Sequence, residues 1–215
     1  MQYVKLWELI EANSPFTFND LPDKFTWRWT ANGCYSAASA YQAQFIGKIQ
    51  SQVCSEIWHT KAIPKCRLYT WLMIHNRCLT ADNLAKRGWP HDPICSLCRC
   101  QLETASHLAA FCSFSQLVWT KVLATLSMPV TLNPNPAMLD VTMWWKEIPK
   151  LVPKLIVSKW RSVALCTWWM LWKERNNRIF NNKSRLPEVL AEKIIEEITA
   201  WKKAGVLRDI WEPGE

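Results

Sequence analysis

The sequence predicts a mainly α-helical protein with one small β-hairpin near its start, which places it in the α+β class. Apolar residues recur at helical spacing along most of the chain. Glycine is rare, with five in 215 residues, and this argues against a β-sandwich or barrel built on many tight turns. The segment 24–30, KFTWRWT, alternates aromatic and polar residues, which is the period of a strand.

The predicted hairpin depends on the residues that follow this segment. Asn32-Gly33 is a strong turn signal, and the chain is expected to become extended again at Tyr35. Ser36 has the residue type of a helix N-cap. A helix is therefore expected from Ser36 to about Ile49.

Boundary residues and apolar periodicity predict the remaining helices. Pro64 suits the first position of a helix. Thr80 suits an N-cap, and Gly88 suits the left-handed end of the helix that follows. With the apolar spacing elsewhere, helices are expected over 3–12, 36–49, 64–76, 81–87, 107–111, 114–126, 140–148, 153–180 and 186–201.

The chain is basic, and the charge is unevenly distributed. Lys and Arg number 26 against 18 Asp and Glu, a net charge of +8, which suggests a polyanionic partner. Residues 154–185 carry eight Lys and Arg against Glu174 alone, whereas 186–215 is acidic. The longest charge-free apolar run, between Arg161 and Lys173, is shorter than the roughly 20 residues that span a bilayer. No membrane contact is expected.

Nine cysteines in a chain without a recognisable signal peptide indicate a reducing, intracellular compartment. The nucleus and the cytoplasm both remain open. Clustered cysteines in such a compartment are interpreted as metal ligands before disulfides. One cluster has the spacing C-x2-C-x8-H-x4-C and consists of Cys95, Cys98, His107 and Cys112.

This spacing predicts a single structural zinc ion. A C-x2-C turn places two thiolates on one side of the ion, and a His and a Cys at the two ends of a helix can complete a tetrahedron. Four protein ligands leave no open position, so the site is structural rather than catalytic. Two alternatives stay open, namely Cys100 in place of Cys98, and reduced thiols beside a buried His without metal.

No catalytic constellation is visible. The other histidines, His59, His75 and His91, pair with no obvious nucleophile. Serine-hydrolase, Walker A and Gly-rich nucleotide motifs are missing, and no two Asp are adjacent. The acids of 186–215 are interpreted as a solvated helix face. We therefore expect no enzymatic activity and no small-molecule substrate.

Several anchor segments follow one another in a familiar order. They are KFTWRWTANGCYSAASAY, IWHTKAIPKCRLYTWLMIHNRCLTADNLAKRGW, CSLCRCQLETASHLAAFCSFSQLVW and WWMLWKERNNRIF. With these anchors, roughly residues 25–180 resemble the zinc-binding region that follows the reverse transcriptase in plant LINE-type (non-LTR) retrotransposons. By position, Cys95, Cys98, His107 and Cys112 match that family's metal ligands, and Glu103 and Leu108 match its flanking positions.

The resemblance implies a domain organisation and a function. It implies a reverse transcriptase zinc-binding domain at 24–128. The residues themselves predict an N-terminal helix and loop at 1–23, a Pro/Asn linker at 129–139 and a Trp-rich helical region at 140–215. The resemblance implies a non-catalytic module that contacts RNA or DNA for a reverse transcriptase, which would act in trans because the sequence holds no polymerase segment. A protein-interaction scaffold and a functionless remnant of a truncated element are the alternatives.

Two groups of cations are the candidate nucleic-acid contacts. Exposed cations with aromatic side chains are how sequence-tolerant single-strand binders work, and Trp71 and Trp89 could supply stacking surfaces. The alternatives are ordinary solvated helix faces and, for the second group, pairing with the acidic last helix. The groups are Lys61, Lys65, Arg67, Arg77, Lys86, Arg87 and Arg99, and then Lys173, Arg175 and Arg178, beside Lys183 and Arg185.

Overall fold

The computed structural model describes residues 26–44, 52–129 and 140–211. The chain divides into two compact units, residues 1–49 and 50–215, and each is described by itself. The predicted helix at 3–12 and nearly all of the predicted linker lie outside the described residues. The predicted domain boundaries stay predictions.

The first unit contains helix α2, Ala37–Ala43, whose start is set by a capping box. The Ser36 hydroxyl accepts a hydrogen bond from the Ser39 backbone N–H at 3.1 Å, and the Ser39 hydroxyl accepts one from the Ser36 N–H at 3.1 Å. Both orphan donors of the first turn are satisfied in this way. The predicted N-cap is confirmed, and the part of the predicted helix beyond residue 44 lies outside the described residues.

The predicted β-hairpin is wrong, because the described residues 26–35 form turns and no strand. The Trp27 N–H donates to the Gly33 carbonyl at 2.7 Å, which closes a loop too short to leave paired strands on either side. Gly33 has a φ of +67°, which suits glycine. The aromatic alternation serves a local contact instead, since Trp27 and Tyr35 meet edge to face at 5.1 Å.

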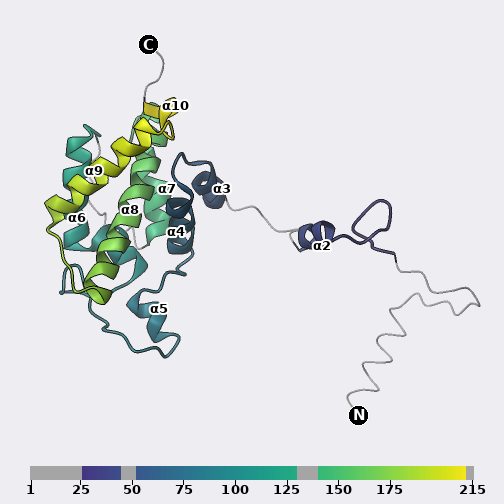
Figure 1. Cartoon of the computed structure of the whole chain (residues 1–215), viewed down its shortest axis with the longest axis horizontal. Helices are drawn as coiled ribbons and strands as arrows, with labels where there is room; N and C mark the ends of the chain where they lie inside the picture. Colours follow the sequence, from purple (N-terminus) through teal and green to yellow (C-terminus); the bar gives the residue numbers. More distant parts are fainter. Residues whose placement is uncertain (1–25, 45–51, 130–139, 212–215) are drawn as a thin grey trace, which may run out of the picture. The chain divides into compact units, whose positions relative to one another are not determined.

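The second unit is helical, as predicted (Figure 1). Pro64 occupies the first turn of its helix, and the Asp140 carboxylate caps the Met143 N–H at 2.7 Å. Helix α3 was not predicted. The elements are α3 Gln52–His59, α4 Pro64–Ile74, α5 Ala81–Ala85, the π-helix η1 His107–Phe111, α6 Ser113–Thr125, α7 Val141–Glu147, the 3₁₀ segments η2 Ile148–Lys150 and η3 Lys154–Ile156, α8 Val157–Phe180, α9 Pro187–Lys203 and α10 Arg208–Trp211.

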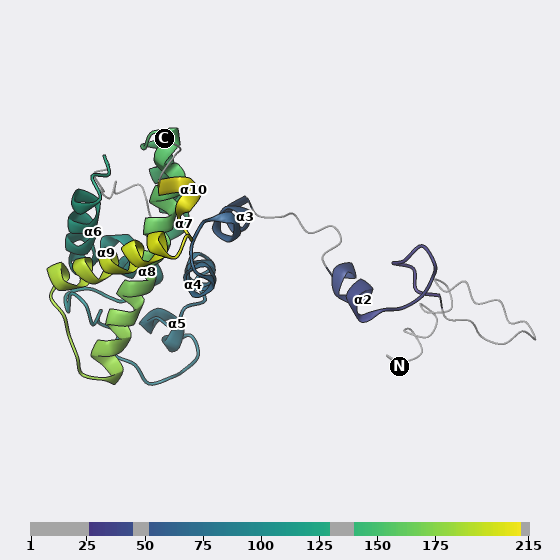
Figure 2. The same ribbon diagram turned by 45° about the horizontal axis from the view of Figure 1, so that its top comes forward.

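Helix α8 is the central element of this unit. It packs against α4 and α9, and α9 also packs against α6, as both ribbon views show (Figures 1 and 2). Its middle residues, 162–168, are all buried, because neighbours cover it on several sides. No helix in the described part of the chain has the length and hydropathy that a membrane crossing needs.

A cluster of tryptophans joins the C-terminal helices to the rest of the unit. The Trp144 ring lies 5.4 Å from Trp119, 5.1 Å from Trp160 and 5.2 Å from Trp168, measured between ring centroids. All four indoles are buried. The indole N–H groups of Trp119 and Trp168 both donate to the Ala109 carbonyl, at 2.9 and 3.3 Å. Residues 140–211 therefore share one core with 52–128.

Candidate metal centre

The first two cluster residues lie in a tight backbone turn. The Arg99 N–H donates to the Cys95 carbonyl at 2.8 Å, and the Cys95 N–H donates to the Gln101 carbonyl at 2.8 Å. An antiparallel bridge between Ile94 and Leu102 closes the base of this turn. Arg99 has a φ of +56°, so the chain reverses sharply after Cys98. The turn directs both thiols to the same side.

The other two cluster residues flank the π-helix η1. The Thr104 hydroxyl accepts from the His107 N–H at 3.0 Å. The Cys112 N–H then donates to the His107 carbonyl at 2.7 Å, a bond between residues five apart. A π-turn places such residues about one turn apart. His107 and Cys112 therefore face the same side of the segment.

The four side chains converge into one site. Their ligand atoms all lie within 4.8 Å of one another. The Cys95 and Cys112 Sγ atoms are 3.9 Å apart, and the Cys98 Sγ is 3.4 Å from His107 Nε2. Around a tetrahedral zinc ion, ordinary bond lengths give about 3.8 Å between two sulfurs and about 3.6 Å between a sulfur and a nitrogen. The cluster fits one structural zinc ion.

Cys100, the alternative ligand, lies outside this group. Its side chain is exposed, and its thiol donates to the Cys98 carbonyl at 3.0 Å. It is not among the side chains that converge on the site. The structure therefore favours Cys98 over Cys100 as the second thiol of the turn.

Electrostatics also favours a cation at this position. The hydrogen bond between the Cys95 and Cys112 thiols raises the pKa of Cys95 and lowers the pKa of Cys112 to about 3. Burial further raises the pKa of Cys95. Two buried sulfurs this close cannot both ionise unless a positive ion offsets their repulsion. A bound divalent cation provides that charge, and it leaves no position for substrate because the protein supplies four ligands.

Glu103 links the metal site to helix α8 through a buried ion pair. Its side chain is 2% exposed and lies 2.6 Å from the Arg175 guanidinium, which is 5% exposed. The same carboxylate accepts from the Ala81 N–H at 3.1 Å, at the start of α5. Glu103 thus ties the segment between the metal-ligand pairs to both α5 and α8.

Arg178 holds the metal-site turn directly. Ser96 and Leu97 are the two residues between Cys95 and Cys98. The Arg178 Nη1 donates to their carbonyls, at 3.1 and 2.9 Å. Its Nε donates to Glu174 at 3.0 Å. Glu174 is fully buried and also pairs with Arg185 at 3.0 Å.

These contacts correct the prediction for Arg175 and Arg178 as nucleic-acid contacts. Both guanidinium groups form hydrogen bonds within the protein. Arg175 is also buried, so a phosphate cannot reach it. The sequence did not reveal that Glu103 pairs with Arg175, or that Ser96 and Leu97 accept from Arg178, because these residues lie more than 70 positions away along the chain. The one available signal was Glu103, an acid between two pairs of metal ligands.

The remaining predicted cations lie mostly on the surface around α4, α5 and the metal-site turn. Arg77 lies over the Trp71 ring and Arg87 over the half-exposed Trp89 ring, both at 5.8 Å. Arg99 is exposed beside the metal-site turn. The others are Lys61, Lys65 over Trp169 at 6.0 Å, Arg67 donating to the Trp58 carbonyl at 3.0 Å, and Lys86 paired with Asp82 at 3.4 Å.

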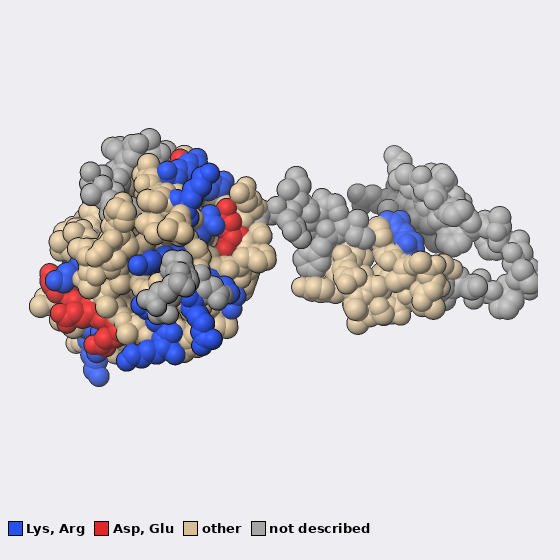
Figure 3. All heavy atoms as spheres, turned by 90° about the horizontal axis from the view of Figure 1, so that it is seen from above, with Lys and Arg blue, Asp and Glu red and all other residues tan. Residues whose placement is uncertain are grey.

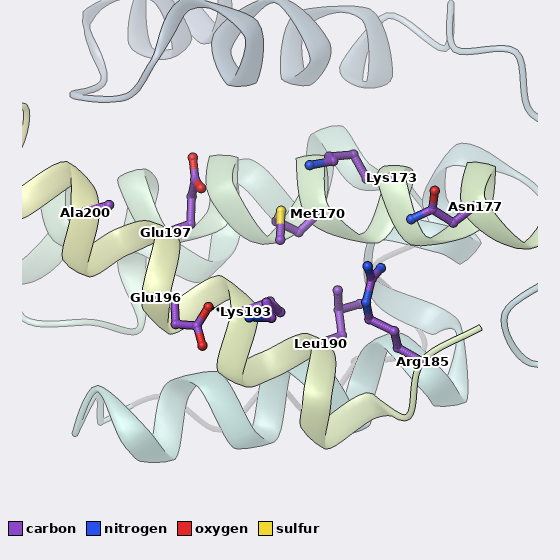
Figure 4. A pocket seen from close by; sticks show the side chains of 9 residues that line it. All are labelled: Met170, Lys173, Asn177, Arg185, Leu190, Lys193, Glu196, Glu197 and Ala200. Atoms are coloured by element: carbon purple, nitrogen blue, oxygen red, sulfur yellow. Dashed lines mark hydrogen bonds and ion pairs between the residues drawn. The ribbon is translucent and has the colours of Figure 1, made fainter. Parts of the chain in front are cut away.

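Two members of the second basic group, Lys173 and Arg185, lie near the acidic helix α9. A pocket of about 610 Å³ lies between α8 and α9. Lys173 and Arg185 line it together with Glu196 and Glu197 (Figure 4). Lys193 also pairs with Glu196 there, at 2.7 Å. The alternative that the second basic group pairs with the acidic last helix is therefore not supported by an ion pair among the described residues, because Arg175 pairs with Glu103 and Arg178 and Arg185 pair with Glu174.

Residues 35–119 match the model of the family described as zinc-binding in reverse transcriptase. The matched stretch contains the whole metal cluster. This match confirms the resemblance that the anchor segments indicate. Residues 35–119 are therefore similar to the zinc-binding region of reverse transcriptases, and the match covers less than half of the chain.

A curated protein of Arabidopsis thaliana, named "Putative ribonuclease H protein", is 18% identical over 105 residues. The similarity covers 47% of this chain and 17% of that protein. The chain therefore corresponds to about a sixth of its relative's length. No solved structure matches the chain.

Proposed function

We propose that this protein is a zinc-organised module of a retrotransposon-derived protein that contacts RNA or DNA for a reverse transcriptase. The observation that carries the proposal is the closed cluster of Cys95, Cys98, His107 and Cys112, at 4.8 Å or closer, within a stretch that matches the reverse transcriptase zinc-binding family. When bound, zinc supplies four metal–ligand bonds that lock this segment in place.

The surface beside the metal site supports this proposal. Arg77 with Trp71, Arg87 with Trp89, and Arg99 form a group of exposed cations and partly exposed indoles. Cations attract the phosphate backbone, and indoles stack on bases without sequence preference. A single-stranded nucleic acid offers both the phosphates and the unpaired bases that these side chains would contact.

The proposal includes a non-catalytic role in an intracellular, reducing compartment, either the nucleus or the cytoplasm. A closed metal site activates no water, and zinc thiolates require reduced cysteines. The three histidines outside the cluster each have a backbone carbonyl near the ring Nδ1, at 2.7 or 2.8 Å, which suits local structure rather than proton transfer.

The test is fluorescence anisotropy with labelled single-stranded RNA and DNA, across a salt series, on zinc-loaded and chelator-treated protein. We expect binding that weakens with salt and is lost with the metal. The double variant Arg77→Gln, Arg87→Gln should bind more weakly. The control, Lys121→Gln with Lys193→Gln, removes the same charge from α6 and α9 and should bind like the parent.

Absence of binding at low salt by a folded, zinc-containing protein would overturn the proposal. Self-association that does not depend on salt would then favour the interaction scaffold. A folded protein with neither property would fit a functionless remnant.

A further inference from the structure

A second basic surface lies where the start of α8, the end of α9 and α10 meet. Helix α10 packs on α8, and the 3₁₀ segments η2 and η3 also pack on α8. Lys and Arg side chains gather on this face when the molecule is seen from above (Figure 3). We call this surface the end face and define it by five cations, Lys154, Lys159, Lys202, Lys203 and Arg208. None of them has an ion-pair partner among the described residues.

The end face is distant from the metal site. Helix α8 carries Lys159 near its start and Arg178, which holds the metal-site turn, near its end. At about 1.5 Å rise per residue, these two positions are about 28 Å apart along the helix axis. The end face is therefore separate from the metal-site turn.

Two lysines of the end face converge on one indole ring. The Lys159 Nζ lies 4.1 Å from the centroid of Trp211, and the Lys202 Nζ lies 5.1 Å from it. The ring attracts both ammonium groups through its π-electrons. Burial and the charge of Lys202 lower the pKa of Lys159. The two like charges therefore cost free energy in the protein alone, and an anion near them would recover it.

We propose that the end face, centred on Lys159 and Lys202 over Trp211, binds the phosphate backbone of a single-stranded nucleic acid. This inference rests on the proposed function and adds a second contact surface to it. Phosphate suits this face because its five cations, four of them lysines, have no ion-pair partner among the described residues, and lysine binds phosphate as a point charge. Spread over two helix ends and α10, the charges suit an extended polyanion.

The structural alternative is that Lys202 and Lys203 only stabilise the C-terminus of α9. Cations at a helix C-terminus have that effect. It does not account for Lys159, which belongs to the first turn of α8, where a helix favours anions. An anion at this position would interact favourably with Lys159, Lys202 and the start of α8 together.

The experiment compares the double variant Lys159→Gln, Lys202→Gln with the control Lys121→Gln, Lys193→Gln in the full chain. Both remove two positive charges. Binding of labelled oligouridine and oligothymidine is measured by anisotropy across a salt series. We expect the end-face variant to bind more weakly and to lower the slope of log K against log salt by about 1.4, since each phosphate contact on a single strand contributes about 0.7.

The outcomes separate this inference from the proposed function. If the parent binds and the end-face variant binds with the same affinity and salt slope, the end face is not a contact surface, although the proposed function stands. If the parent binds neither oligonucleotide, the proposed function fails. Parent binding to phosphatidylserine vesicles that the end-face variant loses, with oligonucleotide binding unchanged, would assign the face to a membrane surface and overturn the inference.

Thermal melts of both double variants provide the check on folding. Removing the Lys159–Lys202 repulsion should leave the melting temperature unchanged or raise it. A lower melting temperature would assign the lysines a structural role. The single variant Lys203→Gln, which leaves the indole contacts intact, then measures the phosphate contribution alone, and an unchanged salt slope in it would also contradict the inference.

Discussion

The thiols of Cys95 and Cys112 are 3.9 Å apart in a buried site. At this distance the hydrogen bond between them holds one proton and favours one thiolate. A zinc ion replaces that proton with a divalent charge and lets every thiol ionise. The residue pattern thus acts as a metal site only because each ligand atom is held near its tetrahedral position.

The first prediction is that Cys95→Ser loses the metal. A serine hydroxyl does not ionise at neutral pH and is a poor zinc ligand, so the bound zinc per chain, measured by inductively coupled plasma mass spectrometry, should fall from one to near zero. Cys100→Ser is the matched control and should retain its zinc, because Cys100 lies outside the cluster. Unchanged zinc in Cys95→Ser would reject this ligand assignment.

The second prediction concerns the buried pair Glu103–Arg175. Arg175→Met leaves the Glu103 carboxylate buried without its cation, and this should lower the free energy of unfolding by about 3–5 kcal/mol. Adding Glu103→Gln removes the orphan charge while keeping an acceptor for the Ala81 N–H, so part of the loss should be recovered. Urea unfolding at fixed zinc concentration measures both. A double variant less stable than Arg175→Met would contradict this account.

At the scale of elements, the metal site is assembled from a turn, a π-helix and the far end of α8. The turn supplies two thiols, η1 supplies His107, and the residue directly after η1 supplies Cys112. Arg178 of α8 donates to both carbonyls inside the turn. Helix α8 is therefore part of the support of the metal site, although the matched family segment ends at residue 119.

The third prediction tests that support. Arg178→Ala removes both donors from the turn and should weaken zinc binding by about 10-fold, a usual cost of losing contacts around a metal site. Competition with a chromophoric chelator measures the affinity. Arg185→Ala is the control, since Arg185 pairs with the same Glu174 carboxylate without contacting the turn. Equal losses in both variants would show that the effect comes from Glu174 instead.

At the scale of the whole molecule, one core joins the metal-binding half to the C-terminal helices. Trp119 of α6 is 1% exposed and packs on Trp144 of α7. Helix α9 packs along α6 as well as α8. The burial of these large side chains is worth roughly 1.5–3 kcal/mol each. Residues 52–128 alone would expose Trp119, because they lack Trp144.

The fourth prediction follows from this shared core. A fragment of residues 50–215 should unfold cooperatively, because it contains the whole second unit. A fragment of residues 50–128 should bind zinc weakly and show no cooperative transition, since it lacks α7, α8 and α9. Near-ultraviolet circular dichroism during thermal unfolding distinguishes the two. A sharp transition in the shorter fragment would show that the metal-binding half is an independent domain.

The local features of this protein could be predicted from its sequence. Ser36, Pro64 and Asp140 begin helices because their side chains or ring geometry satisfy or pre-set the first turn, whatever surrounds them. The four metal ligands could be predicted because zinc chemistry requires these residue types at close spacing, and all four lie within 18 residues of one another.

Only the tertiary structure decided the role of the arginines, the absence of the hairpin and the packing of the C-terminal helices. Arg175 reads as a surface cation in the sequence, but its partner Glu103 lies 72 residues away. The segment 24–30 has the period of a strand, yet its described part, 26–30, forms turns rather than a strand. Burial and pairing are properties of residues brought together from distant positions, and no local pattern specifies which distant residue that will be.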